Sequence, residues 1–241
     1  MAQNIFERYE VKYKMSKEDY KQLLQHMQKH MQIDKFKRHT IRNVYFDTDD
    51  YRIIRHSIEK PLYKEKLRIR MYGEPSEDKI VFVELKKKFK GIVYKRRVDM
   101  KYSDAISYFW NDDKSLENTQ ILKEVDYFIK CNEGIKPKTY IEYEREAFFS
   151  QEDNDFRITF DFNLKYRDID VDLNSSEQDL SVIDEDIVLM EVKTVSGMPF
   201  WLIEFLNEKH IYKQSFSKYA TAYSKFILPN FLQLIRRTVN D

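Results

Sequence analysis

Alternation of charged and apolar residues is the main pattern along this chain of 241 residues. In the stretch KEKLRIRMYG, residues 64–73, a β-strand would place Lys64, Lys66, Arg68 and Arg70 on one face. Leucine, isoleucine and methionine alternate with them and would form the other face. The same alternation recurs in most of the other long stretches that are predicted as strands. The pattern therefore predicts an antiparallel sheet with one apolar face and one strongly charged face.

The full pattern predicts both strands and helices. Strands are expected over residues 5–14, 41–47, 51–57, 63–72, 79–89, 92–101, 138–149, 156–163, 165–170 and 187–194. Helices are expected from Ser16 to about Met31, in two pieces across 103–131, over 199–209, and from about Ser215 to Leu228. No internal repeat, low-complexity tract or Pro/Gly/Ser-rich linker interrupts the chain, so we expect a single domain over residues 1–241.

Composition excludes several classes of protein. The 42 basic and 41 acidic residues nearly cancel, which argues against a general nucleic-acid binder. One cysteine excludes a disulfide framework, and the four glycines form no phosphate-binding loop. No apolar run reaches 18 residues and no signal peptide is apparent, so we expect a cytoplasmic protein without a membrane segment of its own.

The charged strand faces are almost wholly arginine, lysine and acid, whereas a solvated face usually mixes in serine, threonine and amides. A plain antiparallel sheet with a wet polar face is the alternative interpretation. We expect instead an α+β fold in which about eight strands close into an antiparallel β-barrel around a charged tunnel, with helices packed outside. Two like charges about 4 Å apart repel by about 4 kcal/mol at an effective dielectric of about 20, so such cations require anions.

Four carboxylates on the predicted charged faces would supply some of these anions: Glu10, Glu84, Asp161 and Glu191. A polyanionic ligand would supply the rest. Arginine binds phosphate through two parallel hydrogen bonds and lysine binds it as a point charge. Carboxylates at the same depth can hold Mg²⁺ or Mn²⁺, which bridges phosphate oxygens. Together these side chains indicate a site for a triphosphate or a longer phosphate chain.

Nine short motifs in series resemble the triphosphate tunnel metalloenzymes (the CYTH-like superfamily), and among them the VTC-type polyphosphate polymerase domain. They are RYEVKY at 8–13, VYFDT at 44–48, KLRIRMYG at 66–73, FVELKKK at 82–88, YKRRV at 94–98, YEREAF at 143–148, FRITFD at 156–161, LMEVK at 189–193 and FSKY at 216–219. The wider family opens with Glu-x-Glu-x-Lys, and Arg8 replaces the first acid here. This departure resembles the polymerase branch of the family.

The resemblance implies an ATP-dependent polyphosphate polymerase. Such an enzyme transfers the γ-phosphoryl of ATP to phosphate or to a growing polyphosphate chain inside a basic tunnel, assisted by Mn²⁺ or Mg²⁺. The alternatives are a metal-dependent triphosphatase of inorganic or organic triphosphates, and a non-catalytic module that binds polyphosphate or nucleotides. The chain resembles an isolated catalytic domain of a bacterial type, whose product a membrane partner could accept.

The resemblance also assigns roles to residues. The catalytic set is Arg68, Arg70, Lys86 and Glu191, and the metal ligands are Glu191 and Glu10. The phosphate-binding set is Arg8, Lys12, Lys66, Lys88, Lys95, Arg97, Arg145, Arg157, Lys193 and Lys218. Which of Arg145 and Arg157 binds phosphate stays open at this point. The polymerase pattern Lys-x-x-Lys near the C-terminus is matched only by Lys218, with Lys213 as a candidate substitute.

Overall fold

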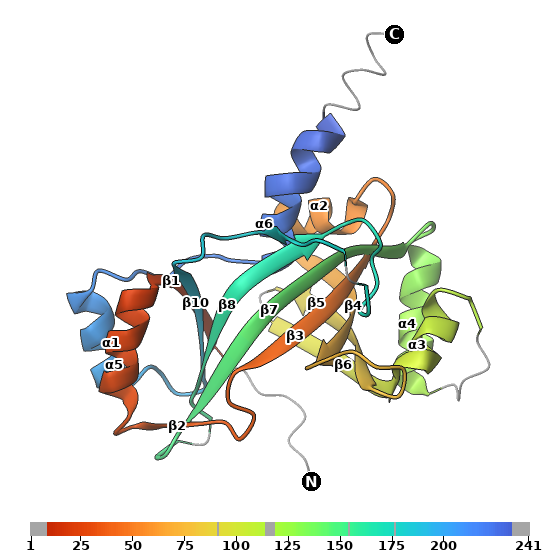
Figure 1. Cartoon of the computed structure of the whole chain (residues 1–241). Helices are drawn as coiled ribbons and strands as arrows, with labels where there is room; N and C mark the ends of the chain where they lie inside the picture. The colour runs from red at the N-terminus through yellow and green to blue at the C-terminus, as the bar shows by residue number, and fades with distance from the viewer. Residues whose placement is uncertain (1–8, 91, 114–118, 154, 176, 233–241) are drawn as a thin grey trace. The chain divides into compact units, whose positions relative to one another are not determined.

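The structure, a computed structural model, describes residues 9–90, 92–113, 119–153, 155–175 and 177–232. Figure 1 shows how the chain passes through its strands and helices. In chain order the elements are β1 (Tyr9–Ser16), α1 (Lys17–Met27), β2 (Met31–Ile33), β3 (His39–Asp47), α2 (Arg52–Ile58), β4 (Tyr63–Tyr72), β5 (Ile80–Phe89), β6 (Ile92–Lys101), α3 (Tyr102–Phe109), α4 (Gln120–Cys131), β7 (Lys136–Ser150), β8 (Arg157–Arg167), β9 (Leu180–Ser181), β10 (Ile187–Thr194), α5 (Phe200–Glu208), α6 (Lys218–Ala222) and a π-helical turn, η1 (Tyr223–Ile227).

The strands form one antiparallel sheet that stays open. Their order is β1-β10-β8-β7-β3-β4-β5-β6, with β2 beside β7 and β9 beside β8. Within the described residues no pairing joins the end strands β1 and β6, so the predicted closed barrel of about eight strands around a tunnel is wrong. Alternation determines the face that each side chain takes, whereas closure depends on strand tilt and stagger, which alternation does not encode. The edge strand β6 is also densely charged, which disfavours further pairing.

The chain divides into two compact units, and β7 and β8 run from one into the other. The first unit consists of the described residues within 1–40, 143–164 and 183–216. The second consists of those within 41–142, 165–182 and 217–241. Each unit has its own apolar core, described separately below.

In the first unit, helices α1 and α5 cover the apolar side of β1, β10 and β8 (Figure 1). The buried side chains of this core include Tyr13, Leu23, Met27, Ile158, Phe160, Met190, Val192, Leu202 and Phe205. Helix α1 begins after Ser16, whose hydroxyl accepts the N–H of Asp19 at 3.0 Å. This N-cap confirms the helix start that the sequence predicts.

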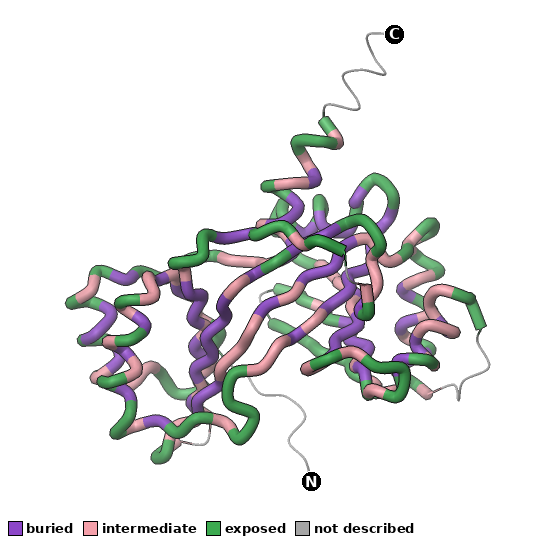
Figure 2. The backbone as a smooth tube through the Cα atoms, viewed as in Figure 1, coloured by how far each residue is buried: buried purple, intermediate pink, exposed green. Residues whose placement is uncertain are grey.

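In the second unit, α3 and α4 cover the apolar side of β4, β5 and β6. The core residues include Val44, Leu67, Ile69, Met71, Val81, Val83, Leu85, Ala105, Val125 and Phe128. Leu67 and Ile69 are 0% exposed, whereas Arg68 between them is only partly buried. Figure 2 shows the resulting alternation of burial along the strands. In β4 and β5 the period-two pattern of the sequence therefore predicted correctly which side chains enter the core.

Residues 51–57, predicted as a strand, instead form helix α2. Residues before the helix satisfy its first N–H groups: Asp47 accepts those of Ile53 and Ile54 at 2.9 Å, and Thr48 Oγ1 accepts that of Arg52 at 3.0 Å. Tyr51 has a φ of +57°, in the left-handed region that turns the chain into the helix. The strand prediction failed because this capping by a carboxylate six residues away leaves no local sequence signature.

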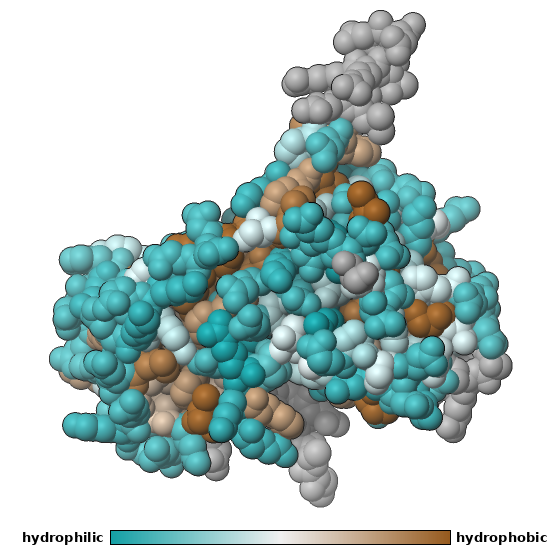
Figure 3. Space-filling view, viewed as in Figure 1, coloured by the Kyte–Doolittle hydropathy of each residue, from teal (hydrophilic) through white to brown (hydrophobic). Residues whose placement is uncertain are grey.

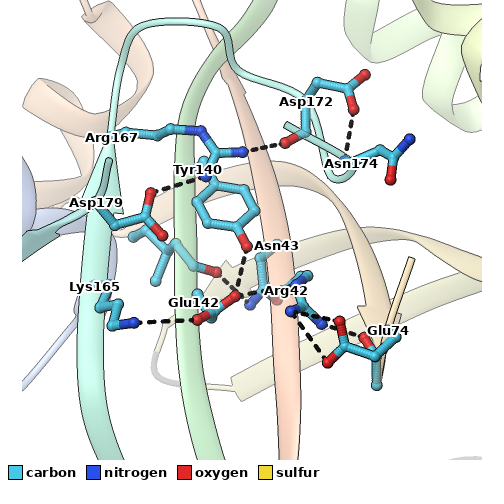
Figure 4. A network of polar contacts seen from close by, with 12 residues as sticks. Arg42, Asn43, Glu74, Tyr140, Glu142, Lys165, Arg167, Asp172, Asn174 and Asp179 are labelled. Atoms are coloured by element: carbon cyan, nitrogen blue, oxygen red, sulfur yellow. Dashed lines mark hydrogen bonds and ion pairs between the residues drawn. The ribbon is translucent and has the colours of Figure 1, made fainter. Parts of the chain in front are cut away.

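Arg167 is the centre of a buried polar network in the second unit (Figure 4). Its side chain is 5% exposed, and its guanidinium lies 3.6 Å from the ring centroid of Tyr140. It donates to Asp179 Oδ1 at 2.8 Å, to the carbonyl oxygen of Asp170 at 3.2 Å and to that of Asp172. Arg167 therefore ties the loop after β8 to strand β7.

Replacing Arg167 with alanine is expected to lower the free energy of unfolding by about 3–5 kcal/mol, because Asp179 and two backbone carbonyls lose their buried partner. Urea unfolding followed by circular dichroism measures this change. Lys165→Ala is the matched control, since Lys165 is 48% exposed and lies 3.8 Å from Glu142. Its loss should cost less than about 1 kcal/mol. Equal destabilisation by the two variants would contradict this role for Arg167.

On the face drawn in Figure 3, hydrophilic side chains predominate and hydrophobic residues lie in scattered patches. This surface agrees with a composition in which 34% of residues are charged. No helix in the described part of the chain is both long and apolar enough to cross a membrane.

Candidate functional site

Strands β4, β5 and β6 of the second unit present a face on which cations lie in rows. We call it the β4–β6 cation face, made of Lys64, Lys66, Arg68, Arg70, Lys86, Lys88, Lys95 and Arg97. The register places Lys66 opposite Lys86 and Lys86 opposite Lys95. Lys64 similarly lies opposite Lys88. Residues directly opposite each other in an antiparallel pair have Cβ atoms about 5 Å apart, so three ammonium groups share one row.

Glu84 is the buried anion of this face. Its side chain is 1% exposed. Arg68 donates from Nε to Oε2 at 2.7 Å, and Lys95 Nζ lies 2.5 Å from Oε1. The Nε atoms of Arg70 and Arg97 lie 3.9 and 3.8 Å from the carboxylate. A single carboxylate thus faces four cations, and the β4–β6 cation face retains excess positive charge.

The pKa of Glu84 reflects this crowding. Burial by itself raises the pKa, but the charges of Arg68, Arg70 and Lys95 outweigh burial and hold the pKa well below its ordinary value. Glu84 therefore stays ionised in neutral solution. It is a counter-ion for the cations and not a proton acceptor.

Lys95 has a pKa that is lowered toward neutral pH. Although 41% of its side chain is exposed, the amino group lies against the buried Glu84. Burial, with a further contribution from Arg70 and Arg68, lowers the pKa to about 8 despite the attraction of Glu84. A bound polyphosphate would raise this pKa again, because an added anion favours the charged amine.

Binding of tripolyphosphate at about pH 8.5 is therefore expected to make Lys95 take up a proton, and at about pH 6.5 it should not. Calorimetric titration in two buffers of different ionisation enthalpy measures the uptake. Proton uptake or release by tripolyphosphate itself is the same in Lys95→Gln at the same pH, so the difference between the two proteins reports the proton taken up by Lys95. Identical proton linkage in the two proteins at pH 8.5 would contradict this account of Lys95.

Strands β1, β10 and β8 of the first unit carry a second face, on which acids and bases alternate. We call it the β1–β10 charged face, made of Glu10, Lys12, Arg157, Glu191 and Lys193, and extended by Arg145 and Asp161. Lys12 lies opposite Glu191, and Glu10 lies opposite Lys193. Lys12 Nζ is 2.9 Å from Glu10 Oε1 and 3.5 Å from Glu191 Oε2, and Lys193 Nζ is 2.6 Å from Glu191 Oε1.

Lys12 is held from several sides. Its amino group also donates to the carbonyl oxygen of Phe216 at 3.1 Å. Burial lowers the pKa of Lys12, but the charges of Glu10 and Glu191 outweigh burial and leave the pKa raised. Lys12 is therefore a fixed positive charge beside two carboxylates.

The two arginines that the sequence left open have different surroundings. Arg145, 14% exposed, donates from Nε and Nη2 to the two carboxylate oxygens of Asp161 at 2.5 and 2.7 Å. Burial lowers the pKa of Arg145, but Asp161 raises it well above its ordinary value. Arg157 is 41% exposed, lies 3.7 Å from Asp34, and lies opposite Lys193 in the sheet. Arg157 therefore has more surface available to a ligand than Arg145.

Glu10 and Glu191 could hold a divalent metal only together with other ligands. Within the described residues no three histidine, cysteine, aspartate or glutamate side chains are grouped as a metal site. Mg²⁺ is commonly held by one or two carboxylates and completed by substrate phosphates and water. Two carboxylates around Lys12 fit this pattern, so the residues are compatible with a metal that binds together with the phosphates.

The remaining predicted residues are placed as follows. Arg8 lies outside the described residues, and Lys218 is the first residue of α6. Lys86 and Lys88 are exposed. The sequence did not identify the aromatic supports of the cations: the Arg97 guanidinium lies 3.5 Å from the ring centroid of Phe82, and Tyr45 OH accepts from Arg68 Nη1 at 2.9 Å. The one available signal was that Phe82 and Tyr45 fall on the charged side of the alternation.

Several solved structures share this fold. A putative adenylate cyclase from Bacillus halodurans is 16% identical and has a TM-score of 0.54, covering 90% of this chain and 96% of its own. A putative adenylyl cyclase from Hippeastrum, described as having a dominant triphosphatase activity, is 18% identical with a TM-score of 0.54, covering 89% of this chain and 94% of its own. A putative adenylate cyclase from Vibrio parahaemolyticus is 13% identical with a TM-score of 0.50, covering 91% and 98%.

The fold is that of the triphosphate tunnel superfamily. A sequence model of the VTC domain matches residues 7–227, so the chain belongs to the VTC domain family. No curated protein matches the sequence. Family membership confirms the resemblance drawn from the nine motifs. It places the chain in the class of triphosphate tunnel enzymes.

Proposed function

We propose that this protein is an ATP-dependent polyphosphate polymerase, which transfers the γ-phosphoryl of ATP to phosphate or to a growing polyphosphate chain. The observation that carries the proposal is the pairing of four carboxylates on the two charged faces, all less than a third exposed: Glu10, Glu84, Asp161 and Glu191. Each is held by a lysine or arginine. A water nucleophile needs a base to accept its proton, whereas a phosphate oxygen is already anionic and needs none.

The β4–β6 cation face supplies charge for the transferring phosphoryl group. Arg68 is fixed on this face by its contacts with Glu84 and with the hydroxyl of Tyr45, so its positive charge has a set position. Arg70 and Lys86 add positive charge on the same face. Fixed cations aimed at the developing charge lower the barrier of phosphoryl transfer without any reorganisation during the step.

The β1–β10 charged face supplies the residues that would hold the metal. Glu191 and Glu10 would hold Mn²⁺ or Mg²⁺, which neutralises phosphate charge and orients the oxygens when it is bound. Lys12 and Lys193 contact these carboxylates in the structure described here. When Glu10 and Glu191 bind the metal, the amino groups of Lys12 and Lys193 would bind phosphate oxygens instead, together with Arg157.

A metal-dependent triphosphatase is the second candidate, because the Hippeastrum relative of the same fold is described as having that activity. The paired carboxylates and the replacement of the family's first acid by Arg8 argue against it in this chain. A module that only binds polyphosphate or nucleotide is the third candidate, and Glu191→Ala should then leave its affinity intact.

Incubation of the purified protein with ATP and Mn²⁺, followed by gel electrophoresis, tests the proposal. We expect a ladder of long phosphate chains. Lys86→Ala should shorten or abolish the ladder, whereas Lys87→Ala should not, because Lys87 contacts Glu65 and Glu124 on the opposite side of the sheet. Free phosphate without a ladder would favour the triphosphatase. Tight tripolyphosphate binding without turnover would favour the binding module.

A further inference from the structure

We infer that Tyr219, anchored by Asp47, is a positioning residue for the cations of β4. The inference rests on the proposed function, in which the β4–β6 cation face, Lys66 and Arg68 included, supplies the positive charge for the phosphates. Tyr219 lies in α6 and is 1% exposed, so it does not touch substrate itself. All the residues involved belong to the second unit.

Asp47 is a rigid anchor at the end of β3. It is 0% exposed, and it accepts the backbone N–H groups of Thr48, Ile53 and Ile54 at 2.9 Å each. The hydroxyl of Tyr219 donates to its Oδ2 at 2.8 Å. The Thr48 hydroxyl adds a longer contact to Oδ1 at 3.5 Å, so the donors around Asp47 occupy the roughly four lone-pair positions that an ionised carboxylate offers. The carboxylate cannot rotate without losing buried hydrogen bonds, so it fixes the Tyr219 hydroxyl.

Tyr219 transmits this fixed position to Arg68 through Tyr45. The two tyrosine rings are stacked, with centroids 4.9 Å apart and an interplanar angle of 26°. Tyr45 OH then accepts a hydrogen bond from Arg68 Nη1 at 2.9 Å. The guanidinium is therefore set from two directions, by Glu84 through Nε and by Tyr45 through Nη1.

Lys66 contacts the same turn of the chain. Its Nζ donates to Ser217 Oγ at 3.5 Å and lies 6.0 Å from the ring centroid of Tyr219. Ser217 is also the N-cap of α6, where its hydroxyl accepts the N–H of Ala220 at 3.4 Å. One helix start thus contacts Lys66 directly and Arg68 through Tyr45.

Tyr223, the first residue of η1 and four residues after Tyr219, is a core tyrosine that can be compared with it. It is 2% exposed, and within the described residues its hydroxyl has no hydrogen-bond partner. Tyr219 differs because its hydroxyl donates a hydrogen bond to the buried carboxylate of Asp47 and its ring is stacked on Tyr45, which accepts a hydrogen bond from Arg68. Side chains locked in the binding geometry lose less entropy when phosphate binds, which strengthens binding.

Calorimetric titration with tripolyphosphate tests the inference without requiring turnover. Tyr219→Phe keeps the ring and removes the hydroxyl, and Tyr45→Phe removes the acceptor of Arg68. Each is expected to weaken tripolyphosphate binding about three- to tenfold, the usual effect of one hydrogen bond. Tyr223→Phe is the matched control and should change affinity by less than about twofold. Thermal unfolding of each variant confirms that it folds.

A double-mutant cycle separates positioning from general stability. If Tyr219 acts through the β4 cations, the effect of Tyr219→Phe should shrink in an Arg68→Ala background. An equal loss in both backgrounds, or no loss in Tyr219→Phe alone, would overturn the inference and leave the proposed function standing. Unchanged tripolyphosphate binding in Arg68→Ala itself would overturn both.

Discussion

Glu84→Gln is expected to lower the free energy of unfolding by about 3–5 kcal/mol, because it leaves four crowded cations, two of them largely buried, without their counter-charge. Four cations lie within 4 Å of this carboxylate, which is 1% exposed. Urea unfolding measures the loss. Glu124→Gln is the matched control, since Glu124 also faces two cations, Lys87 and Arg96, but is 24% exposed. Its loss should cost less than about 1 kcal/mol.

The Glu84 variant also has a characteristic dependence on pH and on anions. The pKa of Glu84 is lower in the folded protein than in the unfolded chain, so its contribution is full above the unfolded value of about 4.3 and is lost as the pH falls below it. The gap in stability between wild type and variant should therefore narrow below about pH 4. Tripolyphosphate should restore more stability to the variant than to wild type. A variant as stable as wild type at pH 7 would contradict the crowded-cation account.

Arg68→Ala is expected to slow phosphate-chain synthesis by about 100- to 1000-fold, the usual effect of removing a fixed charge from a developing oxyanion. Arg68→Lys should recover only part of the rate, because lysine cannot reproduce the fork that contacts both Glu84 and Tyr45. The rate is measured from the growth of the ladder with ATP and Mn²⁺.

Arg96→Ala provides the control for this change. Arg96 is the neighbour of Arg97 in β6 but contacts Glu124 on the helix-bearing side, where it is 44% exposed. Its loss should leave the rate within about twofold. A similar loss of rate in Arg68→Ala and Arg96→Ala would show that general charge, and not the position of Arg68, supports the reaction.

The sequence predicted side-chain faces well because alternation is a local property. Leu67 and Ile69 enter the core while Arg68 and Arg70 take the other face, as a period of two requires. The strands expected over 79–89 and 92–101 form as β5 and β6, which pair with Phe89 opposite Ile92. The closed barrel was not predictable in this way, because closure depends on strand geometry over the whole sheet.

Long-range partners were the second limit. Asp47 reads locally as the end of a strand, yet it bonds Tyr219, 172 residues away in the chain. Tyr45 is 7% exposed, as a core residue would be, but its hydroxyl accepts a hydrogen bond from Arg68. No local pattern encodes such contacts, so the sequence identified the cations and the carboxylates that face them, but not the tyrosines that support Arg68.

Thermal unfolding with and without tripolyphosphate tests the central claim most directly, namely that the cations of the sheet are arranged for a phosphate chain. At about 100 times the dissociation constant, a ligand of the folded state adds about 2.7 kcal/mol, or about 5–10 °C for a chain of this size. Sodium chloride at equal ionic strength controls for screening. We predict a much larger rise in melting temperature with tripolyphosphate. An equal shift with the two salts, or no shift with tripolyphosphate, would contradict the claim.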